Sequence, residues 1–208
     1  MNAEDLLNRS VLLAASGGLD SCTITHWLSH QGISVIGYTA DLGQPDETDM
    51  EDVRQRILAC GANHVVVADL KEQLAYAGLQ LIQSLSRYEG DYWNTTAMAR
   101  HVLIEDMVEE MARRGIYILA HGATGRGNDQ VRFQLAAQML NPDAEVYAPW
   151  RDSAFLEMFG DPVTNPMNWP IAPLEKLCKQ IVDCPHSTPI YSEEKTGFYC
   201  IRSSDIQN

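Results

Sequence analysis

The chain has 208 residues, of which 45% are hydrophobic and 21% charged, with 28 acidic against 15 basic side chains and a formal charge of −13. This length predicts one well-packed domain with a smaller annex, and the composition excludes a disordered chain. The acidic surface disfavours a nucleic-acid substrate, and no apolar run approaches the roughly 20 residues of a membrane span. The acidic start lacks a basic, apolar leader, so we expect a cytoplasmic protein with no membrane partner.

Short apolar segments alternate with helix-like segments from residue 10 to residue 121. The periodicity predicts strands at 10–15, 32–40, 64–68 and 116–121, and helices at 21–30, 51–60 and 97–114. The region before the last helix is mostly helical and is interrupted at 88–94. Such alternation implies parallel strands with right-handed crossovers and helices on both faces. The sequence therefore predicts an α/β fold with a doubly wound parallel sheet, whose ligand crevice lies beyond the carboxyl ends of the strands.

The pattern weakens after Trp150, where prolines recur between Pro149 and Pro189 and only 174–182 still reads as a helix. We therefore expect a main domain at residues 1–151 and a Pro-rich C-terminal extension at 152–208 to which no role is assigned.

The five cysteines are an odd number and predict reduced thiols instead of a disulfide framework. Cys22 and Cys60 have apolar neighbours in sequence and are expected in the core. The other side chains that a metal cluster would draw on are Cys178, Cys184, His186 and Cys200. Their spacings fit no compact zinc motif, so we predict no metal site there.

A glycine-rich loop, Ser16-Gly17-Gly18-Leu19-Asp20-Ser21, joins the first predicted strand to the first helix. It is neither a Walker loop nor the dinucleotide pattern G-x-G-x-x-G. Its paired glycines, two hydroxyls and following helix N-terminus suit a pyrophosphate group. Asp20 would repel a bare phosphate, so it either caps the helix or works through Mg²⁺. A plain strand-to-helix turn is the alternative interpretation.

A second glycine-bearing turn follows the predicted strand at 116–121. The amide of Asn128, the acid of Asp129 and the guanidinium of Arg132 can together hold the ammonium and carboxylate groups of an amino acid. The alternative is a polar turn with scattered charges.

Three stretches of the sequence carry a resemblance to a known family. Ala14–Ser21 resembles the signature of the N-type ATP pyrophosphatases, which cleave ATP between its α- and β-phosphates and have an adenine nucleotide alpha hydrolase-like fold. Tyr38–Gln44 and His121–Phe133 resemble argininosuccinate synthetase, and the similarity runs in order through roughly residues 9 to 151. It covers the nucleotide-binding domain of that family, which couples citrulline to aspartate while ATP becomes AMP and pyrophosphate.

The resemblance implies roles for particular residues. Contacts with ATP are implied for Ala14, Ser16, Gly17, Gly18, Leu19, Asp20, Ser21, Cys22, Ala40 and Gly122. Contacts with the amino-acid substrates are implied for Tyr92, Thr96, Arg100, Thr124, Asn128, Asp129 and Arg132. Asp20, Asp129 and Arg132 are the expected catalytic residues, and ATP and Mg²⁺ the expected cofactors. The substrate's own oxygen would attack the α-phosphorus and an amine would then displace AMP, so catalysis would rest on positioning and charge stabilisation.

The sequence also departs from the family. The family's second domain, which supplies much of the citrulline site, has no counterpart here. Trp93 and Asn94 replace two leucines, and Ala97 replaces a serine, so we expect a changed acceptor pocket.

We therefore predict an AMP-forming carbon–nitrogen ligase of amino-acid or arginine biosynthesis. It would join a ureido or carboxyl substrate to an amino acid such as aspartate, as a homo-oligomer or with a partner subunit. Two alternatives stay open. One is a sulfur or amide transfer enzyme that uses Cys178, Cys184 or Cys200, and the other is a non-catalytic nucleotide-binding partner subunit.

Overall fold

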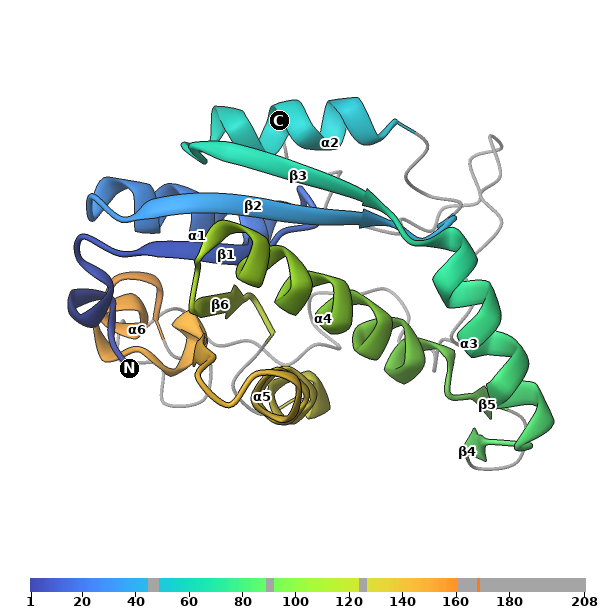
Figure 1. The fold of residues 1–208 in the computed structure, drawn as a ribbon. Coiled ribbons are helices and arrows are strands. Elements are labelled where there is room, and N and C mark those ends of the chain that lie inside the picture. Colours follow the sequence, from blue (N-terminus) through green and yellow to red (C-terminus); the bar gives the residue numbers. More distant parts are fainter. Residues whose placement is uncertain (45–48, 89–91, 124–126, 161–167, 169–208) are drawn as a thin grey trace, which may run out of the picture. The chain divides into compact units, whose positions relative to one another are not determined.

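A five-stranded sheet, with strands in the order β3-β2-β1-β6-β7 and all pairs parallel, forms the centre of the chain (Figure 1). The computed structural model describes residues 1–44, 49–88, 92–123, 127–160 and 168. The strands are β1 (Ser10–Ala14), β2 (Ser34–Asp41), β3 (His64–Asp69), β6 (Ile118–His121) and β7 (Glu145–Tyr147). The predicted doubly wound parallel sheet is confirmed, and the four strands predicted from the sequence are present.

Helices cover both faces of the sheet (Figure 1). They are α1 (Leu19–His30), α2 (Met50–Ala59), α3 (Lys71–Gln83), α4 (Thr95–Arg114), α5 (Asn128–Leu140) and α6 (Ser153–Phe159), with short 3-10 turns η1 (Ala3–Leu6) and η2 (Pro149–Arg151). The core on one face joins α1, α2 and α6 to Leu13, and the core on the other joins α3, α4 and α5 to Leu12. Because β1 is buried on both faces, its central residues form a continuous apolar run.

The ends of the helices follow from local signals in the sequence. The Asp49 carboxylate accepts hydrogen bonds from the amides of Glu51 and Asp52 and so begins α2. Gly115, with φ of +65°, ends α4 in the left-handed conformation. The interruption predicted at 88–94 overlaps two short antiparallel strands, β4 (Arg87–Tyr88) and β5 (Tyr92–Trp93), which lie at the far end of α3 (Figure 1).

The sheet reverses its winding direction between β1 and β6. From β1 the chain adds β2 and then β3 on one side, whereas β6 and β7 lie on the other side. At the carboxyl ends of these two central strands, Ala14 is paired with His121. Open α/β sheets bind ligands at this kind of topological switch point.

Three elements and one burial prediction differ from the sequence-based expectations. Neither α5, α6 nor β7 was predicted. The helix α5 exposes Val131, Leu135 and Met139 and so lacks a clear apolar stripe, and β7 has only three residues. Cys22 and Cys60 are half-buried, and their expected place in the core was wrong. Both lie at helix ends, in the first turn of α1 and at the C-cap of α2.

The compact unit that holds the sheet runs from Met1 to Phe159, beyond the predicted boundary at residue 151. The buried Asp152 accepts hydrogen bonds from the Ala3 amide and the Tyr147 hydroxyl, both at 2.7 Å. The helix predicted at 174–182, the cysteines beyond it and His186 lie outside the described residues. No helix in the part of the chain that the structure describes is long and apolar enough to cross a membrane.

Candidate functional site

The glycine-rich loop is anchored to α2 through the carbonyl of Gly17. This carbonyl accepts a hydrogen bond from Arg56 Nη1 at 2.8 Å and another from the Cys22 thiol at 3.5 Å. Gly17 has a φ of +73°, and an added Cβ would lie 3.0 Å from Cγ1 of Val53. Both features require glycine, since a side chain would strain the backbone and press on the buried Val53.

The two hydroxyls of the loop are held close to Gly18. The Gly18 amide donates to Ser16 Oγ at 3.3 Å, and the Ser21 hydroxyl donates to the Gly18 carbonyl at 3.0 Å. Gly18 is the N-cap of α1, with no side-chain cap, so the first-turn amides keep the capacity to bind an anion. Asp20 is exposed in the first turn and does not cap the helix, so the capping interpretation of this residue was wrong.

The Cys22 thiol, which donates to the Gly17 carbonyl, stays protonated. Burial, together with the neighbouring Cys60, raises the pKa of Cys22 to about 12. The thiol can therefore donate to Gly17 at neutral pH, and its chemistry is that of a hydrogen-bond donor instead of a nucleophile.

Asp129, at the start of α5, is paired with two arginines. Arg100 Nε donates to Oδ2 at 2.9 Å, and Arg132 Nη1 donates to Oδ1 at 2.6 Å. Burial alone would raise the pKa of Asp129, but the two arginines outweigh it and lower this pKa. Two guanidinium groups against one carboxylate leave the cluster positive, which favours a substrate carboxylate beside it.

A single crevice of about 980 Å³ joins the loop to this cluster. The residues predicted for ATP that line it are Ala14, Ser16, Asp20, Ser21, Ala40 and Gly122. The residues predicted for the amino-acid substrates that line it are Thr96, Arg100 and Asp129. The structure therefore brings members of both predicted sets to one cavity.

Several other predicted site residues do not line the crevice themselves. Arg132 pairs with Asp129, and the Tyr92 hydroxyl lies 2.8 Å from Thr96 Oγ1. Leu19 and Asn128 are exposed at the starts of α1 and α5. Thr124 lies outside the described residues.

Sequence reasoning missed two supports of the site. The Gln44 side chain braces the turn after β2, since its Nε2 donates to the Ala40 carbonyl at 3.3 Å and its Oε1 accepts from the Leu42 amide at 2.8 Å. Arg56, which also pairs with Asp52 at 3.0 Å, reaches the loop across 39 residues of sequence. No local pattern marks such a contact.

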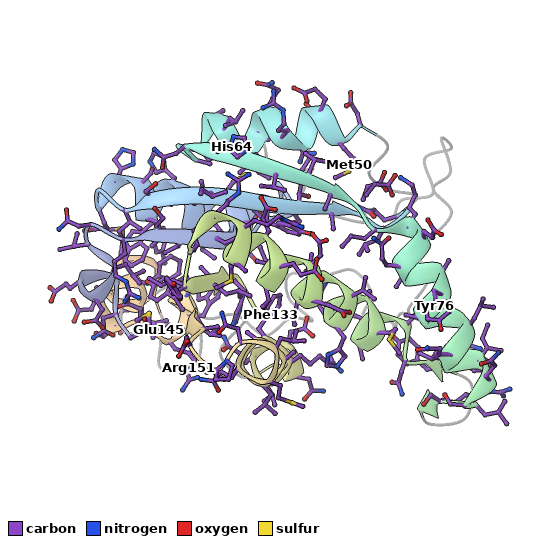
Figure 2. All side chains as sticks on the ribbon, viewed as in Figure 1. Met50, His64, Tyr76, Phe133, Glu145 and Arg151 are labelled. Carbon is purple, nitrogen blue, oxygen red and sulfur yellow. The ribbon has the colours of Figure 1, made fainter. Side chains whose placement is uncertain are left out.

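His121 ends β6 inside the crevice and is only 1% exposed. Its ring stacks on Phe133 with 4.4 Å between centroids and 17° between planes, and Phe133 points from α5 toward the sheet (Figure 2). Burial lowers the pKa of His121 to about 4, against a smaller opposing effect of Asp129 and with a small contribution from Arg151. The imidazole is therefore neutral at physiological pH.

Within the described ranges, no group of three or more histidine, cysteine or acidic side chains is arranged to hold a metal ion.

Comparisons with known proteins identify relatives of this chain. Residues 10–158 match the family described as the arginosuccinate synthase N-terminal HUP domain. The chain is 41% identical over 155 residues to argininosuccinate synthase of Thermotoga petrophila, a match that covers 74% of this chain and 37% of that protein. It is 43% identical over 149 residues to the Aquifex aeolicus enzyme, covering 71% and 36% of the two chains. It is 42% identical over 151 residues to the Homo sapiens enzyme, covering 72% and 36%.

The chain thus matches little more than a third of the length of these relatives. The matched segment contains the loop at 16–21, the turn after β2 and the Asp129 cluster, which meet in the crevice. Together the match and the parallel sheet confirm the predicted adenine nucleotide alpha hydrolase-like fold. The chain belongs to the argininosuccinate synthase family through that family's N-terminal HUP domain.

Proposed function

We propose that this chain is an ATP-dependent ligase that adenylates a ureido or carboxyl substrate and joins it to the amine of an amino acid, releasing AMP and pyrophosphate. One observation carries the proposal: the glycine-rich loop at 16–21, together with Arg100 and Asp129, lines the same crevice of about 980 Å³, and Arg132 pairs with Asp129. Such a volume is at the upper end of small-molecule sites, which suits a nucleotide together with a second ligand.

On the phosphate side, the chain would bind ATP mainly with backbone groups. The first-turn amides of α1 would hold the β- and γ-phosphates, and the hydroxyls of Ser16 and Ser21 would exchange their contacts with Gly18 for phosphate oxygens. The adenine would lie along the turn from Ala40 that Gln44 braces, where the backbone is already fixed.

Mg²⁺ fits the phosphate side through Asp20, an exposed carboxylate in the crevice wall that caps no helix. The ion would neutralise charge on the leaving pyrophosphate. Asp20 would then contribute by holding the positive charge of the ion beside the loop.

At the other end of the crevice, Asp129 would attract the ammonium group of the amino-acid substrate. Arg100 and Arg132 would attract the carboxylate of the same substrate. The lowered pKa of Asp129 makes it a weak base. Its role would therefore be binding and orientation, with the rate enhancement coming from positioning.

Product analysis tests this function. The purified chain is incubated with ATP, Mg²⁺, citrulline and aspartate, and in parallel with a panel of ureido and carboxylic acids and amines. Pyrophosphate and AMP should appear in equal amounts, and only when the ureido or carboxyl substrate is present. The absence of pyrophosphate across the whole panel would reject the proposal. Asp129→Asn should lower turnover while ATP binding persists.

A further inference from the structure

His121 carries a buried hydrogen-bond donor that no described group accepts. The Ala123 amide donates to His121 Nδ1 at 3.2 Å, so Nδ1 serves as an acceptor. In a neutral imidazole the proton then lies on Nε2. Nε2 is shielded from water and has no hydrogen-bond partner in the part of the chain that the structure describes. A buried, unpaired N–H costs free energy, which an acceptor on a ligand would recover.

The position of this donor points to a particular ligand group. His121 is paired with Ala14, the residue directly before the phosphate loop, at the switch point between β1 and β6. On its other side lies α5, where Phe133 fixes the ring by stacking and the charge of Asp129 acts on it. The ring therefore lies between the phosphate loop and the acceptor cluster.

In a ligase of the proposed kind, the α-phosphorus must lie between the same two groups, because the leaving pyrophosphate is held on one side and the substrate on the other. We propose that His121 is a further positioning and catalytic residue of this site, whose Nε2–H donates to a non-bridging oxygen of the α-phosphate of ATP. The inference rests on the proposed function and adds to it a named donor for the reacting phosphate.

A neutral donor suits this step better than a charged one. The α-phosphate gains negative charge at its non-bridging oxygens as the substrate oxygen attacks, and a preorganised N–H stabilises that charge. Since the ring keeps its only proton in this hydrogen bond, it does not act as a general acid toward the leaving pyrophosphate. The stack on Phe133 and the Ala123 contact hold the donor in place.

Two variants and two ligands distinguish the effect of the Nε2–H donor on binding from the effect of the packing of the ring. His121→Phe keeps an aromatic ring against Phe133 but lacks the donor, whereas His121→Gln keeps an N–H close to the place of Nε2. Binding of α,β-methylene-ATP with Mg²⁺ and of adenosine is measured by calorimetry at neutral pH. His121→Phe should bind the methylene analogue roughly 10-fold more weakly and adenosine as the wild type does, and His121→Gln should regain most of the loss. Equal weakening for both ligands would overturn the assignment to the α-phosphate.

Nitrogen-15 spectra of the histidine side chains give a second readout that needs no variant to fold. The wild-type His121 should show the Nε2–H tautomer, and its Nε2 proton should shift downfield with the methylene analogue but not with adenosine. If the wild type binds no analogue, the proposed function fails. If it binds the analogue while the Nε2–H signal stays unchanged, this inference is wrong and the function stands.

Discussion

Arg56 Nη1 donates to the carbonyl oxygen of Gly17 at 2.8 Å and so joins α2 to the glycine-rich loop. With this carbonyl held against α2, Gly17 keeps its left-handed conformation and the next residue, Gly18, can begin α1. The guanidinium also pairs with Asp52 within the same helix at 3.0 Å, which fixes its direction.

Replacing Arg56 should loosen the loop and weaken nucleotide binding. Arg56→Met retains most of the apolar stem but loses the donor to Gly17, so α,β-methylene-ATP should bind roughly 10-fold more weakly by calorimetry. Arg54→Met is the matched control, because Arg54 pairs only with Glu51 of the same helix in the contacts described. Equal losses in the two variants would show that the charge of α2, and not the contact with Gly17, supports the site.

Gly17 should tolerate alanine less well than another glycine of the same backbone conformation. Gly17 and Gly32 have φ of +73° and +77°, but an added Cβ at Gly32 meets nothing within 4 Å. Gly32→Ala should therefore cost only backbone strain, about 1 kcal/mol, whereas Gly17→Ala should cost about 1–3 kcal/mol in unfolding free energy because Val53 is buried beneath it. Urea denaturation measures both. A Gly17→Ala variant as stable as Gly32→Ala contradicts the packing described for the loop.

The neutral, buried His121 should make the fold less stable in acid. Its pKa is about 4 in the fold against 6.5 for the model group, so the unfolded chain binds a proton that the folded chain does not. Its contribution is complete above about pH 6.5 and is lost as the pH falls toward 4, by an amount on the order of 3 kcal/mol. Nearby Asp129 and Arg151 modify the shift in opposite directions.

His121→Phe isolates this contribution, because other acid-sensitive groups remain in both proteins. The difference in unfolding free energy between wild type and variant should change across that pH range and level off above it. Parallel pH profiles would show that His121 is not buried in its neutral form.

Asp152 should prove essential to the compact unit. It is fully buried and accepts hydrogen bonds from the Ala3 amide and the Tyr147 hydroxyl. Asp152→Ala leaves these two donors and the Ala154 amide, which donates to Oδ1 at 3.0 Å, without their acceptor, and should lower the unfolding free energy by about 2–4 kcal/mol. Asp143→Ala, at an exposed turn, should change it by less than about 0.5 kcal/mol. An Asp152→Ala variant as stable as Asp143→Ala would contradict the burial and hydrogen bonding described for Asp152.

Local signals explain which parts of the fold the sequence predicts. The apolar run of β1, the Asp49 cap and the left-handed Gly115 are encoded within a few residues, and these elements agree with the prediction. By contrast α5 buries only Gln130, Phe133 and Ala137 while it exposes apolar side chains, so periodicity could not identify it.

The same distinction applies to the site. The loop at 16–21 and the polar residues at the start of α5 can be recognised as motifs, and the structure brings the loop and Asp129 to one crevice. The contact from Arg56 to Gly17 joins residues 39 positions apart, and the unpaired Nε2 of His121 depends on which amide its other nitrogen accepts. Such features depend on tertiary contacts and leave no local pattern.

The nucleotide products formed from ATP test the central claim most directly. With Mg²⁺, a ureido or carboxyl substrate and an amino acid, the wild-type chain should convert ATP into equal amounts of AMP and pyrophosphate, resolved by ion-exchange chromatography. The formation of AMP and pyrophosphate should require the ureido or carboxyl substrate. Release of ADP and phosphate, or of AMP at the same rate without that substrate, would contradict an adenylating ligase built on this crevice.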